Sequence, residues 1–215
     1  MSVAFWALST SEITTALHFA PNAGQECPYV VNMYSARGEL YRQLELVAPG
    51  PMGLTVELDN LMSELLPDSG VRHARVSIEG VAPGAVMMRV LSKNSHSIVS
   101  PLKVVSNTEP YFLPKNFLKS QQNLLSVMNL EGSDTEVVVK VVLPGRAPES
   151  LLRLDPNSTK VLHLQTEFSE VIDLARKNRI PAYIRVRAKG EGKIAVASLD
   201  QTISDNGVSF KMVTP

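Results

Sequence analysis

The chain of 215 residues contains an internal period of 108 residues. Residues 102–105 read Leu-Lys-Val-Val and residues 210–213 read Phe-Lys-Met-Val, so the same apolar-lysine-apolar-apolar pattern recurs. Residues 84–91 fall at the same offset on residues 192–199, and both segments begin with a glycine that precedes an apolar run. A repeat of roughly a hundred residues has the size of an independently folding domain. The period therefore predicts two copies of one module.

A third pair of segments extends this pattern. Residues 73–80 match residues 183–190 with a slip of two residues, which is what an insertion in a loop between equivalent strands produces. We place the boundary in the polar, proline-containing stretch between the two modules, which predicts a first unit of residues 1–107 and a second unit of residues 108–215.

Within each unit, short apolar runs alternate with glycine- and proline-containing turns, as in a β-sandwich. Ile184 and Val186 alternate with Arg185 and Arg187, as one buried and one solvated sheet face require. The predicted fold is mainly β: two tandem immunoglobulin-like β-sandwiches related by internal duplication, each with one short helix. The expected strands are residues 28–34, 40–47, 54–58, 73–78, 85–91 and 102–105, then 136–143, 151–154, 160–164, 182–188, 193–199 and 208–213.

One helical pattern interrupts the strands of each unit. Asp59 or Asn60 can cap a helix over residues 61–66, and Thr166 can cap a longer one. The apolar positions that share a face of the second helix are Phe168, Val171, Ile172 and Ala175. We expect both helices to cover an open end of their sandwich.

Composition narrows the function. Lys plus Arg and Asp plus Glu both total 21, so no overall positive field attracts nucleic acid, and a nucleic-acid binder is disfavoured. The single cysteine, Cys27, excludes an intramolecular disulfide. The N-terminus lacks the pattern of a secretory signal and no segment is apolar enough to span a membrane, so we expect no membrane insertion and a cytoplasmic location. A chain that begins after a removed signal, and is secreted or lies on the cell surface, would look the same.

No motif identifies a reaction. The four histidines are scattered, without the short spacing of a metal site, so we predict no metal and no cofactor. Ser100 and Lys103 match the Ser-x-x-Lys spacing of some acyl-transfer enzymes, but Pro101 precedes a predicted strand where that motif requires a helical turn. We therefore predict no catalytic residues and no enzymatic activity.

The candidate binding surface lies on one predicted strand of each unit. In the first unit its outward face shows His73 and Arg75, and in the second it shows Tyr183, Arg185 and Arg187. Arginine beside an aromatic ring can hold a carboxylate, a phosphate or a sugar. The alternative is an ordinary solvated sheet face, which an antiparallel sheet normally has.

Aromatic pairs begin both units. Phe5 and Trp6 align with Tyr111 and Phe112 at an offset of 106 residues. Such a pair can fill the core or form an exposed ligand platform, because aromatic rings bury large apolar areas. Trp6 is accordingly a candidate for ligand contact, and its exposure distinguishes the two interpretations.

Several segments of the first unit follow one another in an order known from small β-sandwiches: Trp6-Ala7-Leu8, residues 15–19 with Asn22, residues 29–34, residues 44–49 and residues 55–61. In these segments the unit resembles the sensory rhodopsin transducer family of small bacterial β-sandwiches. The second unit shares Asn129, Leu154, Pro156 and Leu164 and has Phe112 in place of the tryptophan. The resemblance implies a soluble, non-enzymatic, oligomer-forming module. It supplies no catalytic set, and the duplication departs from the family's single unit.

Two hypotheses of different classes follow. The first is a non-catalytic module that binds a partner protein or a ligand, or associates with itself through free sheet edges. The second is a carbohydrate-binding sandwich in which Trp6 or Tyr183 stacks on a sugar ring and Arg185 or asparagine side chains bond its hydroxyls. An enzyme ranks third, because distant serine, histidine and aspartate residues can still converge in space.

Overall fold

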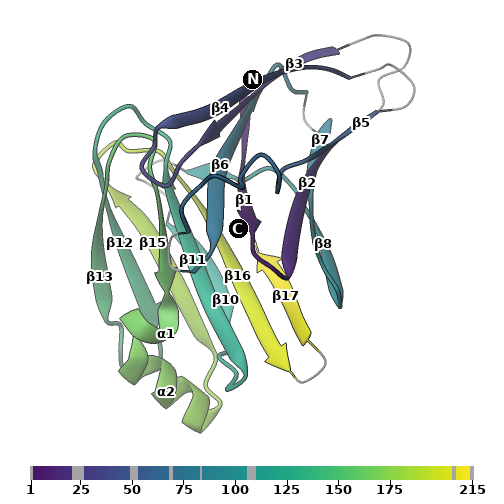
Figure 1. The fold of residues 1–215 in the computed structure, drawn as a ribbon. Coiled ribbons are helices and arrows are strands. Elements are labelled where there is room, and N and C mark those ends of the chain that lie inside the picture. Colours follow the sequence, from purple (N-terminus) through teal and green to yellow (C-terminus); the bar gives the residue numbers. More distant parts are fainter. Residues whose placement is uncertain are drawn as a thin grey trace. The chain divides into compact units, whose positions relative to one another are not determined.

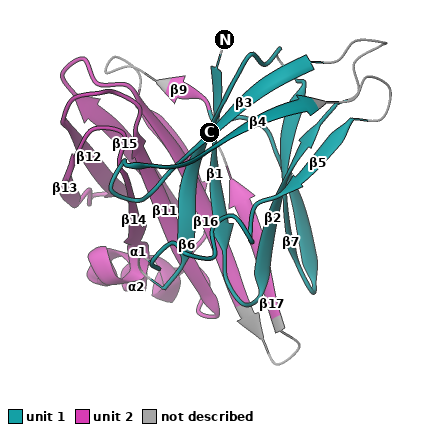
Figure 2. Ribbon diagram, turned by 45° about the horizontal axis from the view of Figure 1, so that its top comes forward, with its two compact units in different colours: residues 1–102 teal, residues 103–215 magenta. Residues whose placement is uncertain are grey.

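The chain folds into two compact units, Met1–Leu102 and Lys103–Pro215 (Figure 2). The computed structural model describes residues 2–20, 27–48, 53–67, 70–82, 84–105, 110–204 and 207–213. The predicted boundary at residues 107 and 108 lies outside these ranges. Within them, every helix is too short or too polar to cross a lipid bilayer.

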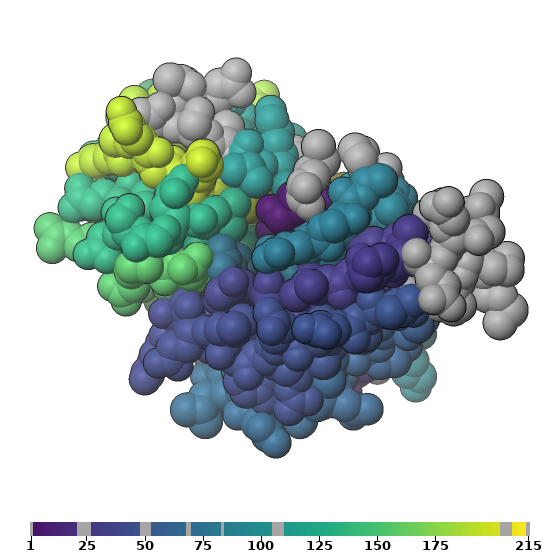
Figure 3. Space-filling view, turned by 90° about the horizontal axis from the view of Figure 1, so that it is seen from above, coloured from purple at the N-terminus to yellow at the C-terminus, as the bar shows by residue number. Residues whose placement is uncertain are grey.

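The first unit consists of two antiparallel four-stranded sheets (Figure 1). One sheet has the order β1 (Ser2–Ser9), β6 (Arg72–Glu79), β3 (Cys27–Tyr34) and β4 (Leu40–Ala48). The other has the order β5 (Leu54–Glu57), β2 (Ile13–Phe19), β7 (Val86–Ser92) and β8 (Ser95–Val99). Phe5 and Val76 of the first sheet and Leu17 and Met88 of the second are fully buried. In the space-filling view, the blue segments of this unit lie closely against one another (Figure 3).

The second unit has two sheets in a corresponding arrangement. One has the order β10 (Tyr111–Lys115), β15 (Ala182–Lys189), β12 (Thr135–Val142) and β13 (Glu149–Leu154). The other has the order β14 (Thr159–His163), β11 (Gln121–Asn129), β16 (Ile194–Ser204) and β17 (Gly207–Val213), and β9 (Val104–Val105) also pairs with β16. A mainly β fold built of sandwiched antiparallel sheets is therefore confirmed.

Side chains from both sheets form the core of the second unit. Val139 and Ile184 come from one sheet and Leu125 and Val196 from the other, and all four are fully buried in one cluster. Helices α1 (Leu164–Glu167) and α2 (Ser169–Asn178) add their apolar face to this cluster, as the 3.6-residue periodicity predicted. The predicted cap at Thr166 is wrong, because α1 contains this residue and neither helix has a side-chain cap.

The two units share one strand order, and this tests the predicted correspondences. Strands β1, β6 and β7 hold the same positions in their sheets as β10, β15 and β16, so three of the aligned segments fall on corresponding strands. The alignment of residues 102–105 with 210–213 is wrong: β9 pairs with β16 in the second unit, while the position of β17 corresponds to that of β8. Origin by duplication and an immunoglobulin-like relationship stay predictions.

The predicted helix over residues 61–66 is also wrong. Residues 59–64 form successive turns, in which the amide of Met62 bonds the carbonyls of Leu58 and Asp59. The Asp59 carboxylate accepts a hydrogen bond from the amide of Thr15 at 3.0 Å instead of capping a helix. After Met62 the main-chain hydrogen bonds join residues three apart, Ser63 to Asn60 and Leu65 to Met62, so no continuous α-helical ladder forms. The buried side chains of Leu58 and Met62 hold the turns in place.

Candidate functional site

The residues predicted to bind in the first unit are buried. Trp6 is fully buried, and His73 and Arg75 are 3% and 5% exposed. The rings of Trp6 and His73 meet edge to face with centroids 6.2 Å apart, and the Arg75 guanidinium lies 4.0 Å from the centroid of the Tyr34 ring. Burial lowers the pKa of Arg75, against the smaller effect of Tyr34. The prediction that His73 and Arg75 face outward is therefore wrong.

The prediction failed because the alternation of residues along a strand does not show which sheet face is exposed to solvent. Alternation correctly places Ala74 and Val76 on the face opposite His73 and Arg75, but both faces of this part of β6 are buried. The two-residue periodicity of a strand shows which side chains lie on the same face. It does not show whether other parts of the protein cover that face.

In the second unit the predicted alternation is confirmed. Ile184 and Val186 are fully buried, whereas Tyr183 is 52% exposed and Arg187 is exposed. Arg185 is half-buried. These outward side chains of β15 stand on the outer surface of the β10-β15-β12-β13 sheet, where strand pairing adds further residues to them.

The strand register assembles a basic surface around the arginines. Phe112, Arg185, Lys140 and Glu149 are opposite one another in a row that crosses all four strands. Arg187 is opposite Val138, and Lys189 is opposite Glu136, in the adjacent rows. We define the basic face as the outward side chains of Phe112, Lys140, Tyr183, Arg185, Arg187 and Lys189.

The basic face contains a depression of about 330 Å³, lined by Val138, Lys140, Glu149, Arg185, Arg187 and Lys189. The Arg185 guanidinium lies 5.9 Å from the centroid of the Phe112 ring, whose residue is 55% exposed. Lys140 bonds Glu149 at 2.5 Å, and Lys189 lies 3.6 Å from Glu136. Within the described part of the chain, neither Arg185 nor Arg187 has a carboxylate within ion-pair distance.

The positive charges of this surface act on the carboxylate of Glu149. Its pKa lies below the ordinary value because Lys140 donates a hydrogen bond to the carboxylate and attracts it electrostatically. Lys189 and Arg187 lower it further by smaller amounts. The basic side chains of this surface outnumber its carboxylates, although the whole chain has no net charge. The arrangement is suited to binding an anion.

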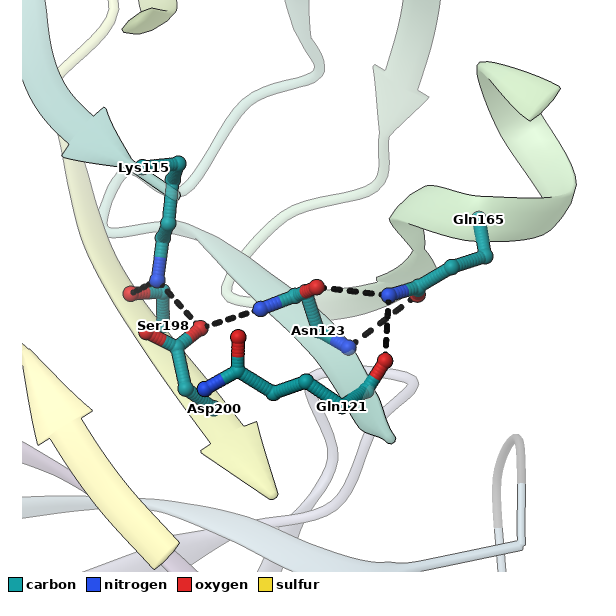
Figure 4. A network of polar contacts seen from close by, with 6 residues as sticks. All are labelled: Lys115, Gln121, Asn123, Gln165, Ser198 and Asp200. Atoms are coloured by element: carbon teal, nitrogen blue, oxygen red, sulfur yellow. Dashed lines mark hydrogen bonds and ion pairs between the residues drawn. The ribbon is translucent and has the colours of Figure 1, made fainter. Parts of the chain in front are cut away.

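A polar network lies elsewhere in the second unit and was not predicted. Figure 4 shows Lys115 pointing toward Ser198 and Asp200 of β16, with Asn123 of β11 on the other side of the carboxylate. Lys115 Nζ lies 2.9 Å from Ser198 Oγ and 2.5 Å from Asp200 Oδ1, and Asn123 Nδ2 donates to the same carboxylate oxygen at 2.6 Å. Gln165 of α1 donates to Asn123 Oδ1 at 2.5 Å.

The network is inaccessible in this structure. The side chain of Lys115 is 2% exposed and Ser198 is fully buried. Burial lowers the pKa of Lys115 more than the adjacent Asp200 raises it. A lysine beside a serine is an arrangement found in some hydrolases, but here Lys115 is bonded to a carboxylate and Ser198 cannot reach a substrate. The sequence contained one indication that Lys115 is buried. Its side chain lies on the same face of β10 as the buried Tyr111 and Leu113.

A groove also lies beside the helices of the second unit. A groove of about 640 Å³ lies between residues 146–150 and 167–171, and its lining contains neither histidine nor cysteine. Among the residues that the structure describes, no three His, Cys, Asp or Glu side chains group in a way that could hold a metal ion.

Comparisons with known proteins leave the family open. No family model matches the chain, and no curated protein matches it in sequence. A structure of infectious bursal disease virus, Gx strain, aligns with 92% of this chain and 57% of its own at 8% identity and a TM-score of 0.19. This score does not establish a common fold. The resemblance to the sensory rhodopsin transducer family stays a prediction.

Proposed function

We propose that this protein is a non-catalytic binding protein that takes up an acidic segment of a partner protein on its basic face. The observation that carries the proposal is the pair of neighbouring arginines, Arg185 and Arg187, which stand on an exposed sheet surface without a carboxylate partner among the described residues. A guanidinium group without such a partner can donate two parallel hydrogen bonds to one carboxylate.

The surroundings favour a polypeptide over a small ligand. Five of the six residues that line the depression are charged, whereas small-molecule sites are lined predominantly by apolar and aromatic side chains. Phe112 and Tyr183 add half-exposed rings beside the cations, and aromatic residues and arginine are the types enriched where proteins bind each other. Electrostatic attraction to the lysines would accelerate the encounter with an acidic partner.

The carbohydrate-binding alternative loses its main feature. Of the two rings named for stacking on a sugar, Trp6 is fully buried and only Tyr183 is exposed. The strand partners of Tyr183 are Pro114 and Val142, whose side chains cannot bond the hydroxyls of a sugar. The next row of the same face has Arg185 and Lys140, which match carboxylates better than neutral hydroxyls. We therefore retain the acidic protein segment as the proposed ligand.

The test measures binding of a poly-glutamate peptide to the full chain by calorimetry. Replacing both arginines, Arg185→Gln with Arg187→Gln, should weaken binding by about tenfold per arginine, since a hydrogen bond to a charged group contributes roughly 1.5 kcal/mol. The matched control is Lys160→Gln with Lys211→Gln, which removes two exposed cations from β14 and β17. The control should bind as the unmodified protein does.

Three outcomes would overturn the proposal. The first is an unmodified protein that does not bind the peptide. The second is an equal loss in the two double variants, which would mean that only net charge matters. The third is a single-stranded nucleic acid or an oligosaccharide that binds more tightly than the peptide at physiological salt and depends on the same two arginines.

A further inference from the structure

Strand β13 has an unpaired edge. It is the last strand in the order β10-β15-β12-β13 and lies at the side of the sheet (Figure 1). Leu151, at its centre, is 48% exposed. Within the described ranges, no main-chain group pairs with β13 on the side away from β12. Such an edge can accept a further strand.

The pairing with β12 shows which main-chain groups face outward. Leu143 and Arg146 exchange both main-chain hydrogen bonds, at 2.8 and 3.1 Å, and the same register continues along β12 and β13. Bonded and non-bonded pairs alternate in an antiparallel ladder. The residues that bond β12 are therefore Ser150, Leu152 and Leu154. The residues whose N–H and C=O groups point away from β12 are Glu149, Leu151 and Arg153.

From the outward direction of these N–H and C=O groups we infer that two copies of the chain associate. Their β13 strands pair antiparallel about a two-fold axis at Leu151. The outward main-chain groups then meet their own counterparts, and Leu151 of one copy is opposite Leu151 of the other. The axis also places Glu149 of each copy opposite Arg153 of the second copy. The strand is thus self-complementary in hydrogen bonding, in apolar contact and in charge.

The charges already present on the sheet extend this complementarity. Lys140 lies 2.5 Å from Glu149, and Glu136 lies 3.1 Å from Arg153. In the dimer these ion pairs join into one row across the interface: Lys140 and Glu149 of one copy, then Arg153 and Glu136 of the second copy. The charges in this row alternate in sign. The main chain adds about six hydrogen bonds, since each of three bonded pairs exchanges two.

This inference does not depend on the proposed acidic ligand. Edge pairing uses the main chain of β13 together with the side chains of Glu149, Leu151 and Arg153. The two arginines that carry the proposed function, Arg185 and Arg187, lie on β15, which β12 separates from β13. Failure of the dimer therefore leaves the peptide-binding test unaffected, and the reverse also holds.

The first test is sedimentation of the full chain over a range of concentrations. The unmodified protein should show a monomer–dimer equilibrium. Leu151→Lys places two ammonium groups opposite each other at the axis and should weaken the dimer at least about tenfold. Ile98→Lys is the matched control, because Ile98 is an exposed apolar residue, 66% accessible, on the edge strand β8. A strict monomer at millimolar concentration, or a dimer that only Ile98→Lys disrupts, would overturn the inference.

The second test uses charge reversal. Glu149→Arg and Arg153→Glu should each impair dimerisation, because each places like charges opposite each other twice. An equimolar mixture should restore it, since the mixed dimer has arginine opposite glutamate at both positions. A mixture that stays as monomeric as its components would refute the proposed register.

The third test needs no substitution. Amide hydrogen exchange of the unmodified protein should show protection of Leu151 that increases with protein concentration, because only the dimer bonds its N–H. The amide of Leu152, which bonds β12, should be protected at every concentration. A rate for Leu151 that does not change with concentration while dimer forms would place the interface elsewhere.

Discussion

Replacing Asp200 by asparagine should test the energetics of the buried polar network most directly. Asp200 is the carboxylate within 4 Å of Lys115 Nζ in the described structure, at 2.5 Å, and the lysine side chain is 2% exposed. Asn123 and Ser198 can still bond the lysine and the new amide, but they carry no charge. The variant Asp200→Asn therefore leaves a buried ammonium group without its counter-ion.

The expected loss of unfolding free energy in Asp200→Asn depends on whether Lys115 keeps or loses its proton. If it stays charged, a broken buried ion pair costs about 3–5 kcal/mol. If it loses its proton, the cost at pH 7 is about 1.4 kcal/mol for each of the roughly 3.5 pH units below its ordinary pKa of 10.5, or about 5 kcal/mol. Either response gives a loss of unfolding free energy of about 3–5 kcal/mol. Lys115→Met leaves the Asp200 carboxylate without its counter-ion, but this carboxylate is 13% exposed and keeps the hydrogen bond from Asn123. The loss should therefore be smaller, about 1–3 kcal/mol.

Urea unfolding of Asp200→Asn, Lys115→Met and the double variant gives the assay. The double variant should be more stable than Asp200→Asn alone, since no isolated charge is left. Burial depresses the folded-state pKa of Lys115, so the unfolded state binds more protons between that pKa and 10.5. The contribution of this residue to stability therefore rises with pH in that window, and Lys115→Met should lack the rise. A cost for Asp200→Asn no larger than that for Lys115→Met would refute this reasoning.

Two further predictions concern stability and are measured in the same unfolding assay. Val186→Asp should destabilise by roughly 4 kcal/mol, because it buries a carboxylate in the core, while Arg187→Asp on the exposed face should change stability by less than about 1 kcal/mol. Equal midpoints for the two variants would contradict the assigned faces. Asn129→Ala should cost about 2–4 kcal/mol, because the buried amide donates to the carbonyls of Ser133 and Asp155 and accepts from the amide of Glu131. A cost near zero would show that water replaces these bonds.

Much of the local structure could be predicted from residue patterns. Alternating polarity at residues 182–188 identified β15 and its buried face, and the spacing of Phe168, Val171 and Ile172 identified α2. Strands β1, β8, β10 and β11 were missed, and β2 entered only through the family resemblance. Strand β8 is largely polar, whereas β1 and β11 have buried residues on both faces and therefore no alternation. Glycines that align in sequence also differ in role. Gly84 has a φ of +78°, whereas a Cβ on Gly192 would lie 2.6 Å from the side chain of Thr135.

By itself, the sequence determined the period of each element, the β-rich class and the outward phase of Arg185 and Arg187. Tertiary structure alone decided that the equally alternating His73 and Arg75 are covered, that Lys115 meets Asp200 across 85 residues of chain, and that Lys140 joins the arginines in one basic face. The physical reason is that side-chain phase is a local property of a strand. Which strands become neighbours, in which register, and what covers their second face depend on contacts between residues far apart in the chain.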